Sequence, residues 1–173
     1  LAMLRALNNR PFAFLWSGQT ISRLGDSLYR IALSWWVLEK TGSAAAMGTV
    51  LVFSTIPMLI FLLVGGVVTD RFPRLKVMLF SDIASGTVVL FITLFSALGL
   101  LEVWHIYIAS LLFGIVEAFF QPAYTATVPE ITPQELLTSA NSLTNLSARG
   151  ASIFGPALGA AIVALGGTSL AFG

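Results

Sequence analysis

The sequence predicts an all-α membrane protein built as a polytopic helical bundle. Hydrophobic residues make up 57% of its 173 residues, charged residues make up only 10%, and the mean hydropathy is +0.90. These values lie well outside the range of soluble globular domains. Five apolar runs are also long enough to cross a bilayer core, which takes a helix of about 20 residues.

The apolar runs follow one another with short polar links. They lie near residues 12–38, 45–68, 77–101, 103–123 and 136–165. Residues 168–173 have the composition of the first turns of another apolar helix, so we expect five complete transmembrane helices and the start of a sixth. Five helices and a stub would leave a packing face without its partner. We therefore interpret residues 1–173 as one transmembrane domain and as a fragment of a longer chain.

The basic residues of the links set the expected orientation. They gather in the N-terminal arm and in the polar hinge at residues 66–76, as Arg5, Arg10, Arg71, Arg74 and Lys76. The links at residues 39–43 and 99–102 are poor in Lys and Arg. Because cytoplasmic loops are enriched in these bases, we expect the N-terminus and the hinge on the cytoplasmic side of the inner (plasma) membrane.

The link at residues 121–134 contains Pro122, Pro129 and Pro133. A proline inside a helix removes a backbone hydrogen bond and clashes with the preceding turn. We therefore expect the fourth helix to end near Ala123. A structured loop should follow, with residues 132–135 capping the next helix.

A polar stripe runs along the first helix. Its members recur at i, i+4, i+7 and i+11 and so share one face: Gln19, Arg23, Asp26 and Arg30. Charged side chains at membrane depth are costly, so they face a protein interior or a water-filled cavity. Asp26 can reach both arginines. The triad is either a structural ladder of ion pairs or part of a polar pathway.

The fourth helix repeats this pattern with Ser110, Gly114, Glu117 and Gln121. Glu117 has no partner on its own helix. It is either a group that takes up and releases protons or the partner of a base on a neighbouring helix, such as Arg149 or Arg23.

Small and polar residues share one face of the fifth helix, with Arg149 at its edge: Asn141, Asn145, Ser152, Gly155 and Gly159. Pro156 lacks an N–H group, and the two glycines let a second helix approach closely. The segment is either a functional bend or a plain packing kink.

Asp82 lies only six residues beyond Lys76. We expect its carboxylate to pair with Arg71 or Arg74 near the membrane surface and to have a structural role.

Composition and motifs exclude several classes of function. The chain has no cysteine and one histidine, His105, and it has no Ser/His/Asp group or phosphate-binding glycine loop. We therefore expect no enzyme activity, no metal site and no cofactor. The net charge of +1, without a dense basic tract, argues against a nucleic-acid partner.

The hinge resembles a motif of the major facilitator superfamily of transporters. In that superfamily the loop between helices two and three has the form Gly-x-x-x-Asp-Arg-x-Gly-Arg-Lys, which Gly66, Asp70, Arg71 and Arg74 match. Pro73 stands in place of the second glycine, and this resembles the branch of macrolide-type and siderophore exporters.

Further segments resemble the same branch, at residues 15–26, 118–123 and 140–143. Gly155, Pro156 and Gly159 are similar to the core of a fifth-helix motif of exporters, although alanines replace two glycines of the fuller pattern. The fourth helix lacks the arginine that many drug–proton antiporters carry. The resemblance covers essentially the whole chain, as the N-terminal six-helix half of such a transporter.

The resemblance implies two six-helix halves that rock around a central cavity. Asp26, Arg30, Glu117 and Arg149 would then line or flank the cavity as proton-coupling residues. The hinge residues would act as a conformational switch, in which Asp70 and Arg74 form contacts that depend on the state of the transporter.

The expected function is secondary active transport, namely proton-coupled efflux of lipophilic or amphipathic small molecules, with drug-like compounds ahead of siderophores. The partners would be the substrate, protons, the lipid bilayer and the C-terminal half of the same chain. Two alternatives remain open. One is a proton-coupled metabolite symporter, and the other is a non-transporting membrane scaffold or sensor with the same fold.

Overall fold

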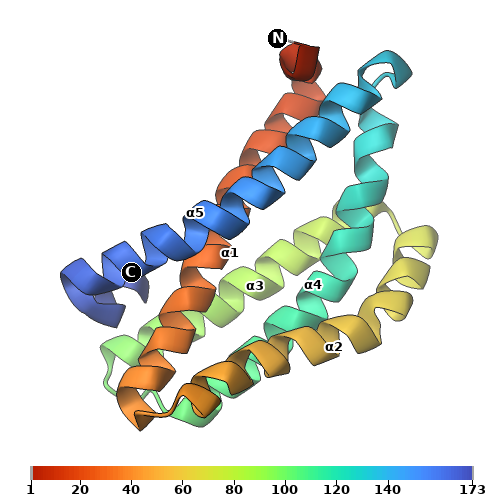
Figure 1. Ribbon diagram of the computed structural model, residues 1–173. Helices are drawn as coiled ribbons and strands as arrows, with labels where there is room; N and C mark the ends of the chain where they lie inside the picture. The colour runs from red at the N-terminus through yellow and green to blue at the C-terminus, as the bar shows by residue number, and fades with distance from the viewer. Residues whose placement is uncertain (1, 173) are drawn as a thin grey trace.

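The computed structural model describes the backbone of residues 2–172 and the side chains of residues 4–166. The described chain is helical throughout, which confirms the predicted all-α class (Figure 1). The elements are η1 (Ala2–Asn8), α1 (Arg10–Thr41), α2 (Ala44–Arg71), α3 (Arg74–Ala97), α4 (Val103–Ile131), η2 (Gln134–Leu136) and α5 (Leu137–Phe172).

Four of the five α-helices are long and apolar enough to cross a membrane: α2, α3, α4 and α5. α1 is not among them, although it has 32 residues. Its middle carries Arg23, Asp26 and Arg30, which lower its hydropathy. The chain is therefore a multi-pass membrane protein whose first helix is the most polar.

The prediction for residues 121–134 is wrong. α4 continues to Ile131 with Pro122 and Pro129 inside it, and only Thr132 and Pro133 separate it from η2. Each proline removes one N–H, but the remaining backbone bonds hold the helix, as in many membrane helices. Most of the predicted link is therefore helical, and α4 continues for about two turns beyond the predicted end at Ala123.

The predicted sixth helix is likewise not a separate element in the described residues. The backbone of α5 continues to Phe172, across Thr168, where a new helix was expected. Glycines at 166 and 167 permit a break without forcing one, because a glycine in a helix costs only about 1 kcal/mol relative to alanine. Gly173 lies outside the described residues.

The helices form two groups. α1 packs mainly on α5, while α2 and α3 pack mainly on α4 (Figure 1). At one end of the bundle, which we name the hinge end, α1 and α3 begin and α2 and α4 end. Asn9 joins two of these termini, because its Oδ1 accepts a bond from Phe12 N–H (3.3 Å) and its Nδ2 donates to the carbonyl of Ile131 (3.1 Å). The opposite end is the far end.

The links between the helices are short at both ends. At the far end α1 ends at Gly42, whose φ of 65° suits glycine, and Ser43 caps α2 by accepting a bond from Ala46 N–H. At the hinge end only Phe72 and Pro73 separate α2 from α3. Most of the predicted polar hinge therefore belongs to the helices themselves.

Two glycines bring α2 and α4 into backbone contact. A Cβ at Gly65 would clash with the carbonyl of Ala118, and a Cβ at Gly114 would clash with the carbonyl of Ser54. In a regular helix the Ala118 carbonyl would accept a bond from residue 122, but Pro122 has no N–H to donate. The Ala118 carbonyl thus lies against Gly65, and glycine is the residue type that leaves room for it.

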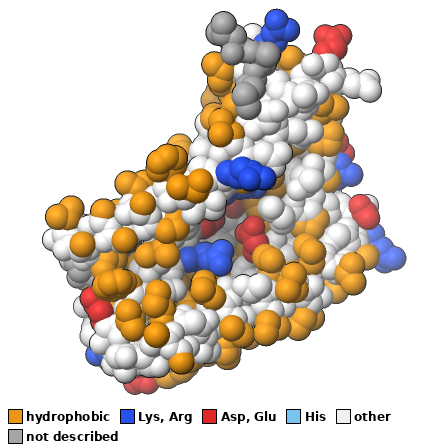
Figure 2. All heavy atoms as spheres, viewed as in Figure 1, with side chains coloured by type: hydrophobic (Ala, Val, Ile, Leu, Met, Phe, Trp, Pro, Cys, Tyr) orange, Lys and Arg blue, Asp and Glu red, His pale blue; other side chains and the backbone are white. Residues whose placement is uncertain are grey.

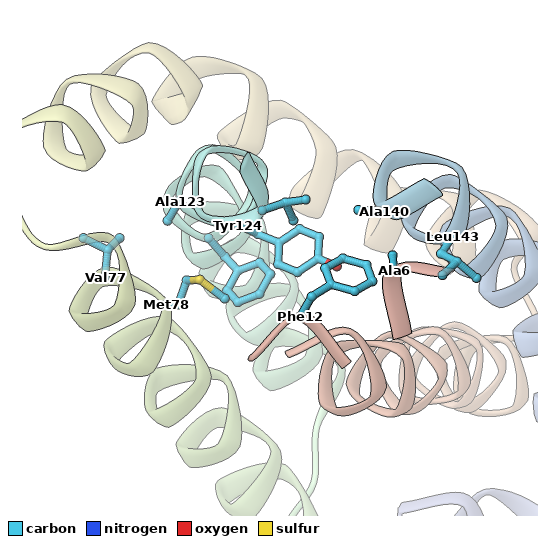
Figure 3. Packing of buried hydrophobic residues seen from close by; sticks show 10 residues of the cluster. Ala6, Phe12, Val77, Met78, Ala123, Tyr124, Ala140 and Leu143 are labelled. Carbon is cyan, nitrogen blue, oxygen red and sulfur yellow. The ribbon is translucent and has the colours of Figure 1, made fainter. Parts of the chain in front are cut away.

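Buried apolar side chains form two clusters, one toward each end of the bundle. The hinge-end cluster joins side chains from η1, α1, α3, α4 and α5, and Figure 3 shows Phe12, Met78 and Tyr124 at its centre. The far-end cluster is built around Leu33 and Ile106. The polar residues of α1 lie between these two apolar clusters.

Candidate functional site

Charged side chains from α1, α3 and α4 interact in the layer between the two apolar clusters. We name this set the charged layer, and its members are Arg23, Asp26, Arg30, Asp82 and Glu117. Figure 2 shows a hollow in the middle of one face of the molecule, with acidic and basic side chains gathered in it. The described chain thus holds its intramembrane charges in a group rather than scattering them over the surface.

The polar stripe of α1 supplies three of these residues. Gln19 is buried and hydrogen-bonds Asp82, and the guanidinium of Arg23 lies 4.8 Å from the ring centroid of Tyr124 on α4. A cation over an aromatic face is attracted to the ring's electron density. The side chains of the stripe therefore point toward α3 and α4, as their shared face predicts.

Asp26 and Arg30 lie farther along α1 and are exposed in the described chain. Asp26 interacts electrostatically with Glu117 and Asp82 as well as with both arginines of its own helix. For Asp26 the sequence predicted only the interactions with Arg23 and Arg30 on its own helix. The triad is therefore part of a larger group and is not an isolated ladder.

Glu117 is placed by α4. It interacts with Arg23 and Arg30 across the helix interface, so Arg23, one of the two predicted partners, lies in its field. The predicted stripe of α4 does not face a single neighbour. Gly114 faces α2, whereas Glu117 is exposed toward the charged layer.

Asp82 is the residue that sequence reasoning placed wrongly. Its hydrogen-bond partner is Gln19, not Arg71 or Arg74. It lies in the third turn of α3, where it interacts electrostatically with Asp26 and Glu117. Its depth within the apolar run was the signal that could have revealed its membership of the charged layer.

The charged layer has an excess of acid. Three carboxylates face two guanidinium groups, so the formal charge is −1 when all five are ionised. Among the described side chains the single ion pair within 4.0 Å lies elsewhere, between Arg74 and Glu130. Charges at such separations attract one another without a single fixed contact.

The described residues contain no group of three histidine, cysteine, aspartate or glutamate side chains that could hold a metal ion. The three acids of the charged layer are therefore too dispersed to act as one ligand set.

Arg149 is not brought into this group by any described contact. It is exposed on α5, and its carbonyl accepts a hydrogen bond from Ser152 Oγ at 2.8 Å. The sequence grouped Arg149 with Asp26, Arg30 and Glu117, and the structure brings together the latter three.

The hinge residues divide into two groups. Gly66, Asp70 and Arg71 lie in the last turns of α2, and no atom comes within 4 Å of a Cβ built at Gly66. Arg74 is the first residue of α3, and its Nη1 lies 2.6 Å from Glu130 Oε1 and donates to the Ala126 carbonyl at 2.8 Å. Arg74 therefore fastens the start of α3 to the end of α4. The sequence did not identify Glu130 as its partner.

Gly155 and Gly159 form the contact between α5 and α1. A Cβ at Gly155 would clash with the side chain of Ser27, and one at Gly159 would lie 3.1 Å from Ile31 Cβ. Pro156 lies between them inside α5. In the described structure these residues are a packing contact, and Ser27 is the neighbour of Asp26.

Comparisons with known proteins agree with this architecture. Residues 2–173 match the family model described as transmembrane secretion effector. Macrolide efflux protein A of Streptococcus pyogenes is 31% identical over 130 residues, covering 73% of this chain and 31% of that protein. The MFS-type transporter YkuC of Bacillus subtilis is 34% identical over 156 residues, covering 88% and 35%.

A third relative is the enterobactin exporter EntS of Citrobacter koseri, which is 28% identical over 174 residues, covering 100% of this chain and 42% of that protein. The chain thus spans less than half the length of these relatives. No solved structure matches it significantly. Given the family match over nearly the whole sequence, the chain belongs to the transmembrane secretion effector family of major facilitator superfamily transporters.

Proposed function

We propose that this chain is the N-terminal half of a proton-coupled exporter of lipophilic or amphipathic small molecules. The charged layer is the observation that carries the proposal. It places an excess of carboxylates at mid-bundle depth, between two apolar clusters, without an ion pair that would hold them ionised. Intramembrane ionisable groups in such positions mark proton and substrate pathways.

Asp26 and Glu117 are the proposed proton carriers, and Arg30 tunes them. Asp26 lies 16 residues into α1 and Glu117 lies 14 residues before the end of α4, so at 1.5 Å per residue they are about 24 Å and about 21 Å from the hinge end. Both are thus near the middle of their helices, which are about 48 Å and about 44 Å long. A group at that depth can exchange protons with either side as access alternates.

The efflux direction and the substrate class rest on relatives. One relative is named as a macrolide efflux protein and another as an enterobactin exporter. A macrolide and a siderophore share bulk and mixed polarity. We therefore propose drug-like amphipathic compounds first and siderophores second.

The remaining length of the relatives supports a second half of the same chain, which would cover the hollow face with charged side chains that Figure 2 shows. Arg149 is proposed to face that cavity from α5. The hinge is proposed to act as the conformational switch, because Arg74 ties α3 to α4 by a contact that a shift of either helix would break.

The test of coupling uses inverted membrane vesicles from cells expressing the complete protein. An imposed pH gradient should drive accumulation of a lipophilic dye in wild type, and Glu117→Gln should reduce it by about tenfold or more, since acid–base groups typically contribute that much. Glu135→Gln is the matched control, because Glu135 is exposed in η2, outside the charged layer. Equal accumulation by wild type and Glu117→Gln would refute this assignment of the proton carrier.

We also propose that the hinge end is cytoplasmic, because it gathers the bases that the positive-inside rule counts. Residues 1–173 contain no cysteine, so a single one can be introduced there and labelled once any cysteine in the rest of the complete protein has been replaced. In intact cells an impermeant maleimide should label Lys40→Cys at the far end and not Lys76→Cys at the hinge end. The reverse pattern would invert the topology.

A further inference from the structure

We propose that Asp82, together with Gln19, is the site through which protons pass between the charged layer and water at the hinge end. The inference rests on the proposed proton coupling and adds a residue and a direction to it. It concerns the interior of α3, where neither the hinge motif nor the expected cavity lining includes a residue. Its basis is the depth of Asp82, the nature of its partner and the charges around it.

The depth of Asp82 sets it apart from the other two carboxylates. The starts of α1 and α3 and the end of α4 lie at one level, because Asn9 bonds Ile131 and Arg74 bonds Glu130. Asp82 is eight residues into α3, so it is about 12 Å from this end, compared with about 21 Å for Glu117. It lies between the mid-bundle acids and the hinge-end surface, and it is itself exposed.

The partner of Asp82 suits a residue that changes protonation state. Gln19 carries both an N–H donor and a carbonyl acceptor on one side-chain amide. In the structure the amide hydrogen-bonds the Asp82 side chain as a donor. Rotation of the amide would let its carbonyl accept a bond from the carboxylic acid of a protonated Asp82. Glu130 differs, because its partner Arg74 has only N–H donors and no acceptor.

The surrounding charges connect Asp82 to the proposed carriers. From α1 they are Arg23, Asp26 and Arg30, and from α4 the charge is Glu117. Asp82 interacts electrostatically with both Asp26 and Glu117. α2 has ionisable residues only at its hinge end, Asp70 and Arg71, and α5 has only Arg149. A negative charge on Asp82 therefore favours proton uptake at the other two carboxylates, and the reverse also holds.

The proposed sequence moves one proton. Glu117 takes a proton from water while the charged layer is open to the far end. The proton then passes through water in the hollow to the carboxylate of Asp82, which leaves Glu117 ionised. Asp82 releases it to water at the hinge end and returns to the ionised form bonded to Gln19.

The experiment uses the complete protein in proteoliposomes and compares two rates with a lipophilic cationic dye. One is net transport driven by a pH gradient, and the other is exchange of labelled for unlabelled dye without net proton movement. We expect Asp82→Asn to lower the ratio of net transport to exchange at least about tenfold. Asp82→Glu should restore the ratio, and Glu135→Gln should leave it unchanged.

A pH profile separates proton release from a purely structural role. Wild-type net transport should fall as the pH on the hinge-end side drops, because Asp82 rebinds protons there. Asp82→Asn should lose this dependence. A wild-type ratio and profile in Asp82→Asn, or an equal fall of both rates, would overturn the assignment of Asp82.

Two further variants keep the test decisive. If Asp82→Asn does not fold, Gln19→Leu removes the amide while keeping the carboxylate, and it should shift the hinge-side pH profile; an unshifted profile would overturn the proposal.

Glu117→Gln distinguishes the assignment of Asp82 from the proposed proton coupling. If it abolishes net transport while Asp82→Asn does not, only the role of Asp82 fails, whereas wild-type behaviour of Glu117→Gln would remove the proposed coupling itself.

Discussion

At the hinge end Arg74 and Glu130 lie with their charged atoms 2.6 Å apart, whereas in the charged layer no described pair of opposite charges comes within 4.0 Å. The hinge-end pair is balanced, partly exposed and backed by a carbonyl acceptor. The charged layer has three acids for two bases. The hinge-end contact thus fastens two helices together, whereas the charged layer is the region for which we propose a change of charge.

The largest effect should come from neutralising an acid of the charged layer. Asp26→Asn leaves two carboxylates for two guanidiniums and removes a proposed carrier, so gradient-driven dye accumulation should fall by about tenfold or more. The same change should affect thermal stability little, because Asp26 is exposed. Accumulation in vesicles and unfolding in detergent measure the two effects. A large loss of stability with little loss of transport would make Asp26 a structural residue.

The packing beside the charged layer should give the next largest effect. Gly155→Val forces a branched side chain against Ser27, the neighbour of Asp26, and overpacking of this kind costs about 1–3 kcal/mol. Gly18→Val is the matched control, because no atom lies within 4 Å of a Cβ there. Equal stability of the two variants, measured by thermal unfolding in detergent, would show that α5 does not need the glycine to reach α1.

The hinge-end pair should contribute less. Arg74→Ala removes the ion pair and the bond to the Ala126 carbonyl, and we expect a loss of about 1–2 kcal/mol in the free energy of unfolding. Glu130→Ala should cost less, because the carbonyl bond remains. A double-mutant cycle measures the interaction between the two side chains. An interaction energy of zero would mean that Arg74 acts only through the carbonyl.

Salt should give the smallest effect. The side chains of Arg74 and Glu130 are 30% and 56% exposed, so their attraction is screened as the Debye length falls from about 10 Å at 0.1 M to about 3 Å at 1 M salt. The interaction energy from the double-mutant cycle should therefore shrink by a few tenths of a kcal/mol in 1 M NaCl. An interaction that does not weaken would point to a pair shielded from water.

The sequence predicted the fold class, the order of the five helices and the face that carries Gln19, Arg23, Asp26 and Arg30. Periodicity identifies residues that share a helix face, and this rule is local. The same rule could not show that Asp82 bonds Gln19 or that Glu130 bonds Arg74, because these contacts depend on how separate helices pack. The end of α4 was predicted wrongly for a related reason. Pro122 disfavours a helix locally, but the rest of α4 keeps this segment helical.

The contact between Gly65 and Ala118 has a consequence for how the sequence can change over evolutionary time. Pro122 frees the Ala118 carbonyl, and Gly65 leaves the space that this carbonyl occupies. A side chain at position 65 would require α2 and α4 to move apart, because Gly114 meets the Ser54 carbonyl just as closely although Met58 has an N–H to donate to it. We therefore expect relatives that keep the close contact between α2 and α4 to retain both Gly65 and Gly114, whether or not they retain the proline at position 122.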